Sequence, residues 1–378
     1  MDYLYLDHAA TSPMRESIWS AMRNAEEVGY GNPSGSHKIS RKAKNIVEES
    51  REVIAASVGA APEEIVFTSS GTESDNWSIK SPFQSSFPTS QDLVVSSIEH
   101  EAVIESAKWV ENRGHKVSFV NPNNAGKVES SEFIQSIRET TAVASLMWGN
   151  NETGVLQPVS DIGKAVKGNK KLIFHSDIVQ GFVSTKIDFH KHGITSAAMS
   201  AHKIGGPKGI GFMFLHNKYK IDSYLHGGKQ ELERRAGTVN VVGVAGFAAA
   251  VKEHQDRFDE EVGLIKNEKN TFEELISENI KISVTGLEEE RLPHISNIQI
   301  RGVNSENLLV LLDLDGVGVS RGSACSSGAQ KPSHVLEAMQ IDKKDLNSHL
   351  RISFGWTTKV GDGARAAGKI INTIKGLK

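Results

Sequence analysis

The chain has 378 residues, with 43 basic and 46 acidic side chains and a formal charge of −3. This balance gives no electrostatic case for direct nucleic-acid binding, and 24% charged with 38% hydrophobic residues is ordinary for a soluble globular protein. No apolar run approaches the roughly 20 residues of a membrane helix, and the N-terminus resembles neither a signal peptide nor a transit peptide. We therefore expect a cytoplasmic protein of two or three domains that does not bind membranes.

The N-terminal part predicts short strands that alternate with helices. A strand at residues 4–6 precedes helices at about 15–28 and 40–58, and the glycine-rich loop between these helices includes Asn32, a candidate for substrate contact. Such loops are more often plain connections. The strand at 64–68 leads into a turn of hydroxyl residues and Gly71 that opens a helix. Free backbone N–H groups at Gly71 and Thr72 can bind a phosphate there, although Ser and Thr also cap helices for structural reasons alone.

The next strands end in polar residues. His100 follows a strand at 93–97, Asn151 follows one at 142–148, and the strand at 172–177 ends in Asp177. This repetition is typical of a mostly parallel sheet with a site along one edge. An imidazole at that edge can stack on a cofactor ring and move protons, although a lone histidine is often a surface or core residue.

Lys203 follows the apolar run 194–199 and precedes a cluster of glycines and a proline. Most lysines are solvated surface charges, but this one lies at a strand edge rather than on a helix face. A desolvated lysine with a lowered pKa can attack a carbonyl cofactor, because the amine must be neutral to do so. Asp177, 26 residues upstream, can pair with the pyridinium nitrogen of pyridoxal phosphate. Taken alone, an aspartate at a strand end is more often a helix cap.

The C-terminal part predicts a second domain. After a strand at 209–215, a polar loop at 227–240 includes Thr238, a phosphate-binding candidate for a neighbouring subunit. One long helical pattern at 241–278 predicts a connector, beyond which strands and helices alternate and a strand at 350–354 includes Arg351. We expect a large cofactor-binding domain at 14–255 and a small domain formed by 1–13 and 256–378.

The single cysteine, Cys325, excludes an intrachain disulfide and a thiolate metal cluster within one chain, and we expect no metal site. A solitary cysteine is by default a small buried hydrophobic residue. Its small, polar and glycine-bounded neighbours at 320–328 instead predict an exposed loop from which a thiol can react.

Several sequence blocks together resemble the NifS/IscS-like cysteine desulfurases of the class-V aminotransferase family. They span nearly the whole chain and are Gly31-Asn-Pro-Ser, residues 66–76, Asn150-Asn-Glu-Thr-Gly, His202-Lys203, Arg235-Ala-Gly-Thr and Gly322-Ser-Ala-Cys-Ser. The resemblance implies an α/β protein of pyridoxal-phosphate fold type I, with a mostly parallel central sheet in a large domain and a smaller α+β domain. It also implies a homodimer.

Roles for single residues follow from the same resemblance. Lys203 is the lysine that binds the cofactor covalently, Asp177 pairs with its pyridinium nitrogen, and His100 stacks on its ring and transfers protons. The residues implied to hold the cofactor are Gly71, Thr72, His100, Asn151, Asp177, Gln180, Ser200, His202, Lys203 and Thr238, the last donated across a dimer interface. The residues implied to hold the substrate are Asn32, Asn151 and Arg351. Cys325 is the implied nucleophile.

The implied activity converts L-cysteine to L-alanine and leaves a persulfide on Cys325 for a protein acceptor, such as an iron-sulfur scaffold, a tRNA-thiolation enzyme or a cofactor-biosynthesis enzyme. Another lyase acting on C–S bonds, an aminotransferase or a selenocysteine lyase on the same fold remains an alternative, as does a catalytically silent scaffold. The sequence departs from the usual pattern at Ile178, which replaces a small residue expected to pack on the cofactor ring, and at Ala201 and Arg321.

Overall fold

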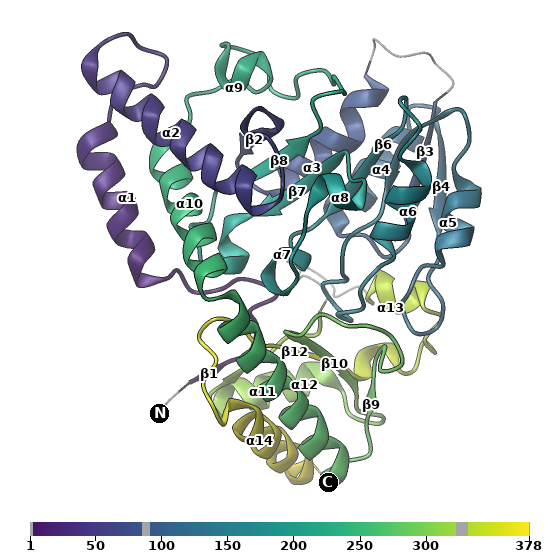
Figure 1. Cartoon of the computed structure of the whole chain (residues 1–378). Helices are drawn as coiled ribbons and strands as arrows, with labels where there is room; N and C mark the ends of the chain where they lie inside the picture. Colours follow the sequence, from purple (N-terminus) through teal and green to yellow (C-terminus); the bar gives the residue numbers. More distant parts are fainter. Residues whose placement is uncertain (1–2, 85–90, 323–331, 378) are drawn as a thin grey trace.

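The computed structural model describes residues 3–84, 91–322 and 332–377. Its largest sheet has seven strands in the order β2-β8-β7-β6-β5-β3-β4 (Figure 1). Strand β8 is antiparallel to both of its neighbours, and the other adjacent pairs are parallel. The strands are β2 (Ile65–Thr68), β3 (Asp92–Ser96), β4 (Lys116–Val120), β5 (Thr141–Ser145), β6 (Ile173–Asp177), β7 (Ser196–Ser200) and β8 (Gly211–Leu215). The predicted mostly parallel sheet is confirmed.

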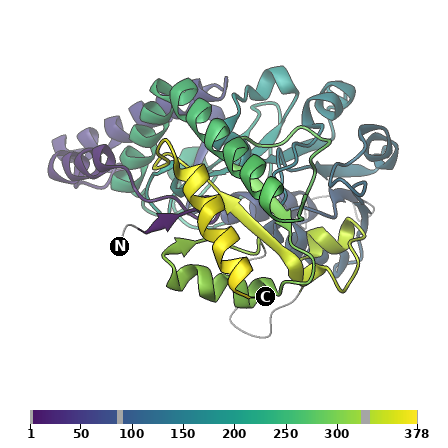
Figure 2. The ribbon, with the colours of Figure 1, turned by 90° about the horizontal axis from the view of Figure 1, so that it is seen from below.

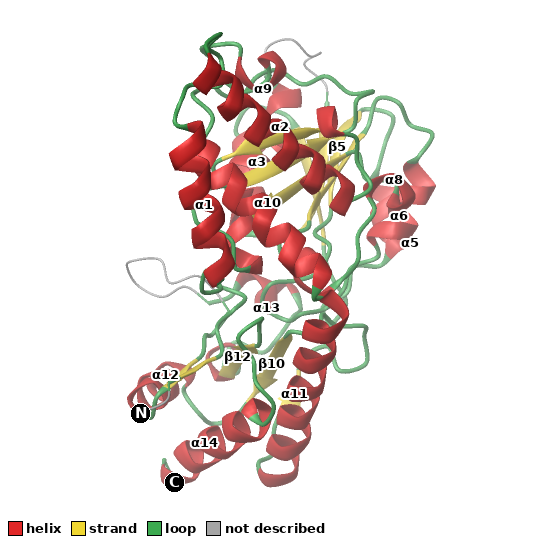
Figure 3. Ribbon diagram, turned by 60° about the vertical axis from the view of Figure 1, so that its left-hand side comes forward, coloured by secondary structure: helices red, strands yellow, loops and turns green. Residues whose placement is uncertain are grey.

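Helices cover both faces of this sheet, which is why β2 and β5 to β8 are buried at every residue. On one face α1 (Glu16–Gly29), α2 (Lys38–Ser57) and α10 (Val241–Asp256) pack against one another (Figure 3). The remaining helices of this part are α3 (Gly71–Lys80), α4 (Glu101–Glu111), α5 (Ser130–Ser136), α6 (Val159–Val166), α7 (Gly181–Ser184), α8 (Phe189–His192) and α9 (Gln230–Glu233).

In Figure 1, a smaller part of the molecule lies below the large sheet. It contains an antiparallel sheet in the order β12-β10-β9 and a parallel pair, β1-β11. Its helices α11 and α14 lie side by side (Figure 2). The elements are β1 (Leu4–Tyr5), α11 (Phe258–Asn279), β9 (Ser283–Val284), β10 (Ile295–Gln299), α12 (Ser305–Leu314), β11 (Val317–Gly318), α13 (His334–Ala338), β12 (His349–Ser353) and α14 (Asp362–Gly376).

The smaller part has a hydrophobic cluster of its own, in which Leu4 and Leu6 pack with Phe272, Leu350 and Ile370. The first strand of the chain therefore belongs structurally with its C-terminal third. The domain limits proposed from the sequence, 14–255 against 1–13 with 256–378, remain a prediction that is compatible with this packing.

The long helical pattern at 241–278 is two helices rather than one. Helix α10 ends at Asp256 and α11 begins at Phe258, with Arg257 between them at φ −109° and ψ 7°, outside the helical region. The break redirects the chain from the large sheet into the smaller part. None of the helices in the described residues is both long and apolar enough to cross a membrane.

Candidate active site

A cavity of about 490 Å³ lies where the carboxyl ends of the large sheet face the smaller part. Ten of the predicted site residues line it: Gly71, Thr72, His100, Asn151, Asp177, Gln180, Ser200, His202, Lys203 and Arg351. Asn32 and Thr238 are exposed and are not part of this lining. Cys325 lies outside the described residues, although Ser320 and Gly322, which precede it, line the cavity.

Lys203 lies in the 3₁₀ turn Ala201–Ile204, directly after β7. Gly205 ends this turn at φ +80°, a conformation that favours glycine. The Lys203 ammonium donates to the backbone oxygens of Ala9 and Ala10, both at 2.7 Å. Burial, reinforced by the charge of Arg351, lowers the pKa of Lys203 to about 8. At pH 7 roughly one amine in ten is then neutral, against fewer than one in a thousand for an ordinary lysine.

Asp177 ends β6 and is buried in the floor of the cavity. Its Oδ1 accepts one hydrogen bond, from the Val179 N–H at 2.9 Å. Burial raises the pKa of the Asp177 carboxyl, and His100, this hydrogen bond and Lys203 oppose that effect. A buried carboxylate with so little compensation requires a cationic or hydrogen-bonding partner in the cavity.

His100 is the N-cap of α4, and its Nδ1 accepts the Ala102 N–H at 3.1 Å. The hydrogen bond assigns the ring proton to Nε2 when the imidazole is neutral. Burial lowers the His100 pKa against the opposing charge of Asp177. One ligand atom from each of His100, Asp177 and Asp75 lies within 4.8 Å of the others.

Sequence reasoning missed Asp75 and its partner His175, whose Nε2 lies 3.0 Å from Asp75 Oδ1. The available signal was spacing, because residues 71, 72 and 75 share one face of a helix. Burial, with the charges of Asp177 and Glu99, raises the pKa of Asp75 well above its usual range. Asp75 therefore adds to the negative potential around the cavity floor only when it is ionised.

The start of α3 provides an anion site at the cavity wall. Ser70 caps this helix of 10 residues by accepting the Glu73 N–H at 3.2 Å, and Gly71 and Thr72 follow it. A Cβ on Gly71 would lie 3.0 Å from Val179 Cγ2, so glycine allows this close approach. A helix N-terminus with free N–H groups, lined also by Ser200 and His202, suits a phosphate.

Arg351 reaches the cavity from β12 of the smaller part. Its Nη2 donates to Asp7 Oδ1 at 2.7 Å and its Nη1 to the backbone oxygen of Asn151 at 2.8 Å, whereas its buried Nε has no hydrogen-bond partner in the structure as described. A buried guanidinium with an unsatisfied donor is suited to a ligand carboxylate. Asp7 was not predicted, because no local sequence pattern connects it with Arg351, 344 residues away.

Gln180 is fixed by two contacts. Its Nε2 donates to the Ala9 oxygen at 2.8 Å, and its Oε1 lies 3.1 Å from His294 Nε2. The expectation that Ile178 packs on the cofactor ring is wrong, because Ile178 is fully buried in the hydrophobic core and Val179 lines the cavity instead.

The sequence profile of the aminotransferase class-V family matches residues 4–362. The chain belongs to this family. A putative cysteine desulfurase IscS 1 from Bacillus subtilis (strain 168) is 38% identical over the full length of both chains. A cysteine desulfurase IscS from Methanosarcina thermophila is 36% identical, covering 93% of this chain and 87% of the relative.

Solved structures agree with the family. A NifS-like protein superimposes with a TM-score of 0.91 at 29% identity, covering 99% of this chain and all of the other. SspA in complex with cysteine gives a TM-score of 0.80 at 29% identity, covering 93% and 98% of the two chains. The fold type I predicted from the sequence is confirmed for this class-V aminotransferase.

Class-V aminotransferases depend on pyridoxal phosphate, and the cavity fits that cofactor. Asp177 offers a buried carboxylate to a pyridinium N–H, the start of α3 offers N–H groups to a phosphate, and Lys203 offers an amine of lowered pKa to an aldehyde. These three demands are met in one cavity by residues at or just after the carboxyl ends of β6, β2 and β7.

Proposed function

We propose that this class-V aminotransferase is a pyridoxal-phosphate-dependent cysteine desulfurase, which removes sulfur from L-cysteine and leaves L-alanine. The observation that carries the proposal is one cavity that Lys203 and Asp177 line together with Arg351 of the smaller part. The full-length similarity to relatives named cysteine desulfurase supports the same activity.

Arg351 and Asn151 bind the substrate in this proposal. The planar guanidinium, held by Asp7, pairs with the carboxylate of L-cysteine and directs its amino group toward Lys203. Asn32 is a further substrate contact, and Thr238 of a second subunit contacts the cofactor phosphate in a homodimer. Their exposure on the single chain is compatible with this arrangement.

The cofactor, when bound, supplies an electron sink for the bonds at the substrate α-carbon. Lys203 transfers the α-proton at its Nζ, for which a pKa of about 8 is well matched to neutral pH. Asp177 would hydrogen-bond the ring nitrogen of the bound cofactor and keep it protonated. His100 would hold the ring and move protons through Nε2, Gln180 would donate to the ring hydroxyl, and Ser200 and His202 would bind the phosphate with Gly71 and Thr72.

Cys325 is the proposed nucleophile. Its thiolate attacks the sulfur of the bound cysteine, an S–S bond forms, and the Cβ–S bond breaks with its electron pair passing to the substrate carbon. Proton transfer to that carbon then yields L-alanine, and the sulfur remains as a persulfide. An acceptor protein, such as an iron-sulfur scaffold or a tRNA-thiolation enzyme, removes it in the cytoplasm.

A single-turnover reaction with L-cysteine tests this function, followed by intact-mass and peptide mapping under non-reducing conditions. We expect one equivalent of alanine and one added sulfur on Cys325. In Cys325→Ala we expect both to be lost. Pyruvate with free sulfide, or undiminished sulfide release from Cys325→Ala, would instead indicate a different lyase, and a higher kcat/KM for selenocysteine would indicate a selenocysteine lyase.

A further inference from the structure

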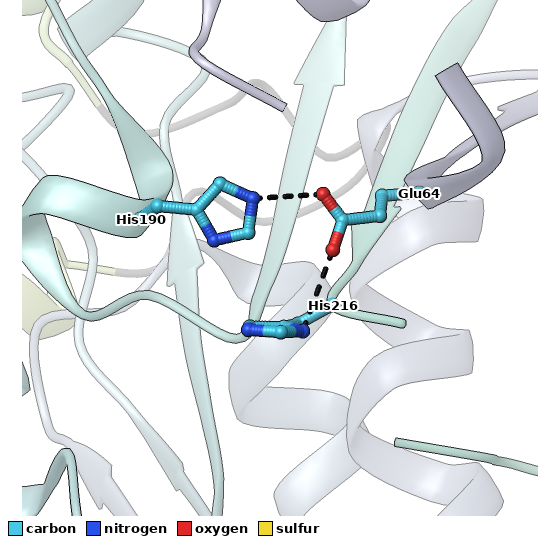
Figure 4. A group of neighbouring side chains, drawn as sticks. All are labelled: Glu64, His190 and His216. Atoms are coloured by element: carbon cyan, nitrogen blue, oxygen red, sulfur yellow. Dashed lines mark hydrogen bonds and ion pairs between the residues drawn. The ribbon is translucent and has the colours of Figure 1, made fainter. Parts of the chain in front are cut away.

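A second cluster of ionisable groups lies at the opposite edge of the large sheet and consists of Glu64, His190 and His216 (Figure 4). Glu64 ends the 3₁₀ helix Pro62–Glu64 just before β2, His190 lies in α8, and His216 directly follows β8. The antiparallel pairing of β2 with β8 brings Glu64 and His216 together, and α8 leads into β7, the other neighbour of β8. Three separate segments thus converge on one point.

The spacing of the cluster is close to what a bound metal ion needs. His190 Nε2 lies 2.8 Å from Glu64 Oε2, and His216 Nδ1 lies 3.4 Å from Glu64 Oε1. One ligand atom from each residue lies within 4.8 Å of the others. In a tetrahedral zinc site with bonds of about 2.0–2.2 Å, neighbouring ligand atoms are roughly 3.3–3.5 Å apart. The separations of 2.8 and 3.4 Å and the upper limit of 4.8 Å in the cluster bracket this spacing.

Glu64 is oriented by its surroundings. Its side chain is 1% exposed, its Oε2 accepts the Ala61 N–H and its Oε1 accepts the Asn217 N–H, both at 3.0 Å. These two backbone hydrogen bonds hold the carboxylate in one orientation, as hydrogen bonds commonly do for metal ligands.

His216 presents a lone pair rather than a proton to Glu64. Its Nδ1 accepts the Lys218 N–H at 3.3 Å, which places a lone pair rather than a proton on this nitrogen. No proton then bridges the 3.4 Å between this nitrogen and the carboxylate oxygen. Two electron-rich atoms at that distance are best stabilised by a cation between them, which would replace the long hydrogen bond from Lys218.

The cluster is accessible from solvent. The His190 side chain is 40% exposed and that of His216 is 17% exposed. Both line a cavity of about 610 Å³ that is also lined by Lys167, Lys170 and Lys218. An ion at the cluster therefore has an entry path and room for a fourth ligand, and the nearby lysines favour water ionised to hydroxide, or another anion, in that position.

We propose that Glu64, His190 and His216 bind one Zn²⁺ ion, with a water molecule as the fourth ligand. Two imidazoles and one carboxylate are a ligand set that zinc accepts, with one coordination position left open. The ion connects the segment before β2, helix α8 and the segment after β8. The site is independent of the proposed desulfurase activity, because it uses none of the residues that line the active-site cavity.

The test uses the cofactor-loaded full-length chain with Cys325→Ser, so that the single thiol does not bind metal. After chelator treatment and dialysis, Co²⁺ is titrated as a spectroscopic probe and Zn²⁺ is measured by elemental analysis after gel filtration. We expect one Zn²⁺ per chain and the intense visible absorption of four-coordinate Co²⁺. His190→Gln and His216→Gln should each lower the affinity about 100-fold or more, because each removes a direct ligand.

His226→Gln is the matched control, since His226 is exposed and does not belong to the cluster. It should bind zinc like the parent chain. A stoichiometry near zero, or equal binding in the parent, His190→Gln and His216→Gln, would overturn the proposal. Binding that persists in both variants would place the ion elsewhere, for example at Asp75, His100 and Asp177.

A second measurement uses no variant of His190 or His216, so it still tests the proposal if those variants fail to fold. Zn²⁺ should protect His190 and His216 of the otherwise unmodified chain against diethyl pyrocarbonate at least about tenfold, as mapped by peptide mass spectrometry. His226 should react equally with and without the ion. Equal reactivity of His190 and His216 in both conditions would contradict zinc binding at this cluster.

Discussion

The two ends of the strands in the large sheet have different electrostatic environments. The end that faces the active-site cavity is the carboxyl edge, and the end with the second ionisable cluster is the opposite edge. At the carboxyl edge, the half-buried Lys203 has a lowered pKa, the buried Asp177 has a raised pKa, and both line a cavity. At the other edge, the charge of Glu64 is met directly by two backbone N–H groups and by His190. The buried Asp177 carboxylate therefore has fewer hydrogen-bond partners within the described residues than the buried Glu64 carboxylate.

The topology explains this difference. At the carboxyl edge, the turns that follow β6 and β7 both border the active-site cavity. Arg351, from the smaller part, lines the same cavity. At the opposite edge β2 and β8 are directly paired and α8 packs against them, so Glu64 is compensated locally. The lowering of the Lys203 pKa from 10.5 to about 8 corresponds to about 3 kcal/mol. The cavity disfavours the protonated amine by this amount, relative to water, and so favours the neutral amine that the chemistry uses.

The largest effect is expected at Lys203. Lys203→Ala should lower alanine formation from L-cysteine by about 10³-fold or more, because no other amine lines the cavity in the described chain. The visible absorption of lysine-bound cofactor should also disappear. Lys186→Ala, whose side chain is 70% exposed, is the control and should retain the parental rate. A Lys203→Ala rate above one tenth of the parental rate would remove Lys203 from its proposed role.

A smaller effect is expected at Asp177. Asp177→Asn should lower kcat by about 10²-fold, because the amide keeps the shape but not the charge opposite the ring nitrogen. Asp259→Asn is the same chemical change at a side chain that is 84% exposed, and its kcat should stay within about twofold. Similar rates for the two variants would mean that the buried charge is structural, and the contrast between the edges would then have no catalytic meaning.

Arg351 should affect substrate binding more than turnover. Arg351→Lys should raise the KM for L-cysteine about 30-fold, since an ammonium cannot pair with both carboxylate oxygens and also reach Asp7. Arg291→Lys alters another paired arginine of the smaller part, at 2.7 Å from Glu273, and should leave KM unchanged. A loss in kcat with no change in KM would assign Arg351 to another step.

Much of the fold follows from the sequence because buried strands are apolar and end in polar residues. The predicted strands at 172–177 and 194–199 match β6 (Ile173–Asp177) and β7 (Ser196–Ser200) within one or two residues. The break at Arg257 was missed because neither glycine nor proline marks it. The signal for a helix end was therefore absent from the local sequence.

The candidate site was also predicted only in part. Lys203, Asp177 and His100 were found because each lies at or just after the end of a strand, which places it at a known edge of the sheet. The Asp7 partner of Arg351, 344 residues away, depends on long-range packing that no local pattern encodes. The Glu64, His190 and His216 cluster was missed, and no metal site was expected, because its ligands come from three segments without a fixed spacing.

The smallest effect is a pH dependence. In cofactor-free protein, the acylation rate of Lys203 by dilute acetic anhydride should rise with pH to a plateau with its midpoint at about 8, because the amine reacts only when neutral and its pKa is lowered to about 8. The acylation rate of exposed lysines should continue to rise toward pH 10. Peptide mass spectrometry after competitive labelling gives both curves in one experiment.

Two comparisons sharpen this measurement. Lys269 also has a pKa of about 8 through burial, but it lies on α11 and does not line the active-site cavity, so it should level off at the same pH with a slower maximal rate. Asp177 favours the charged form of Lys203, so Asp177→Asn should move the Lys203 midpoint to lower pH. A midpoint near 10 in the parent chain would show that burial does not lower the pKa of Lys203. The carboxyl edge would then lack the electrostatic property that distinguishes it from the opposite edge.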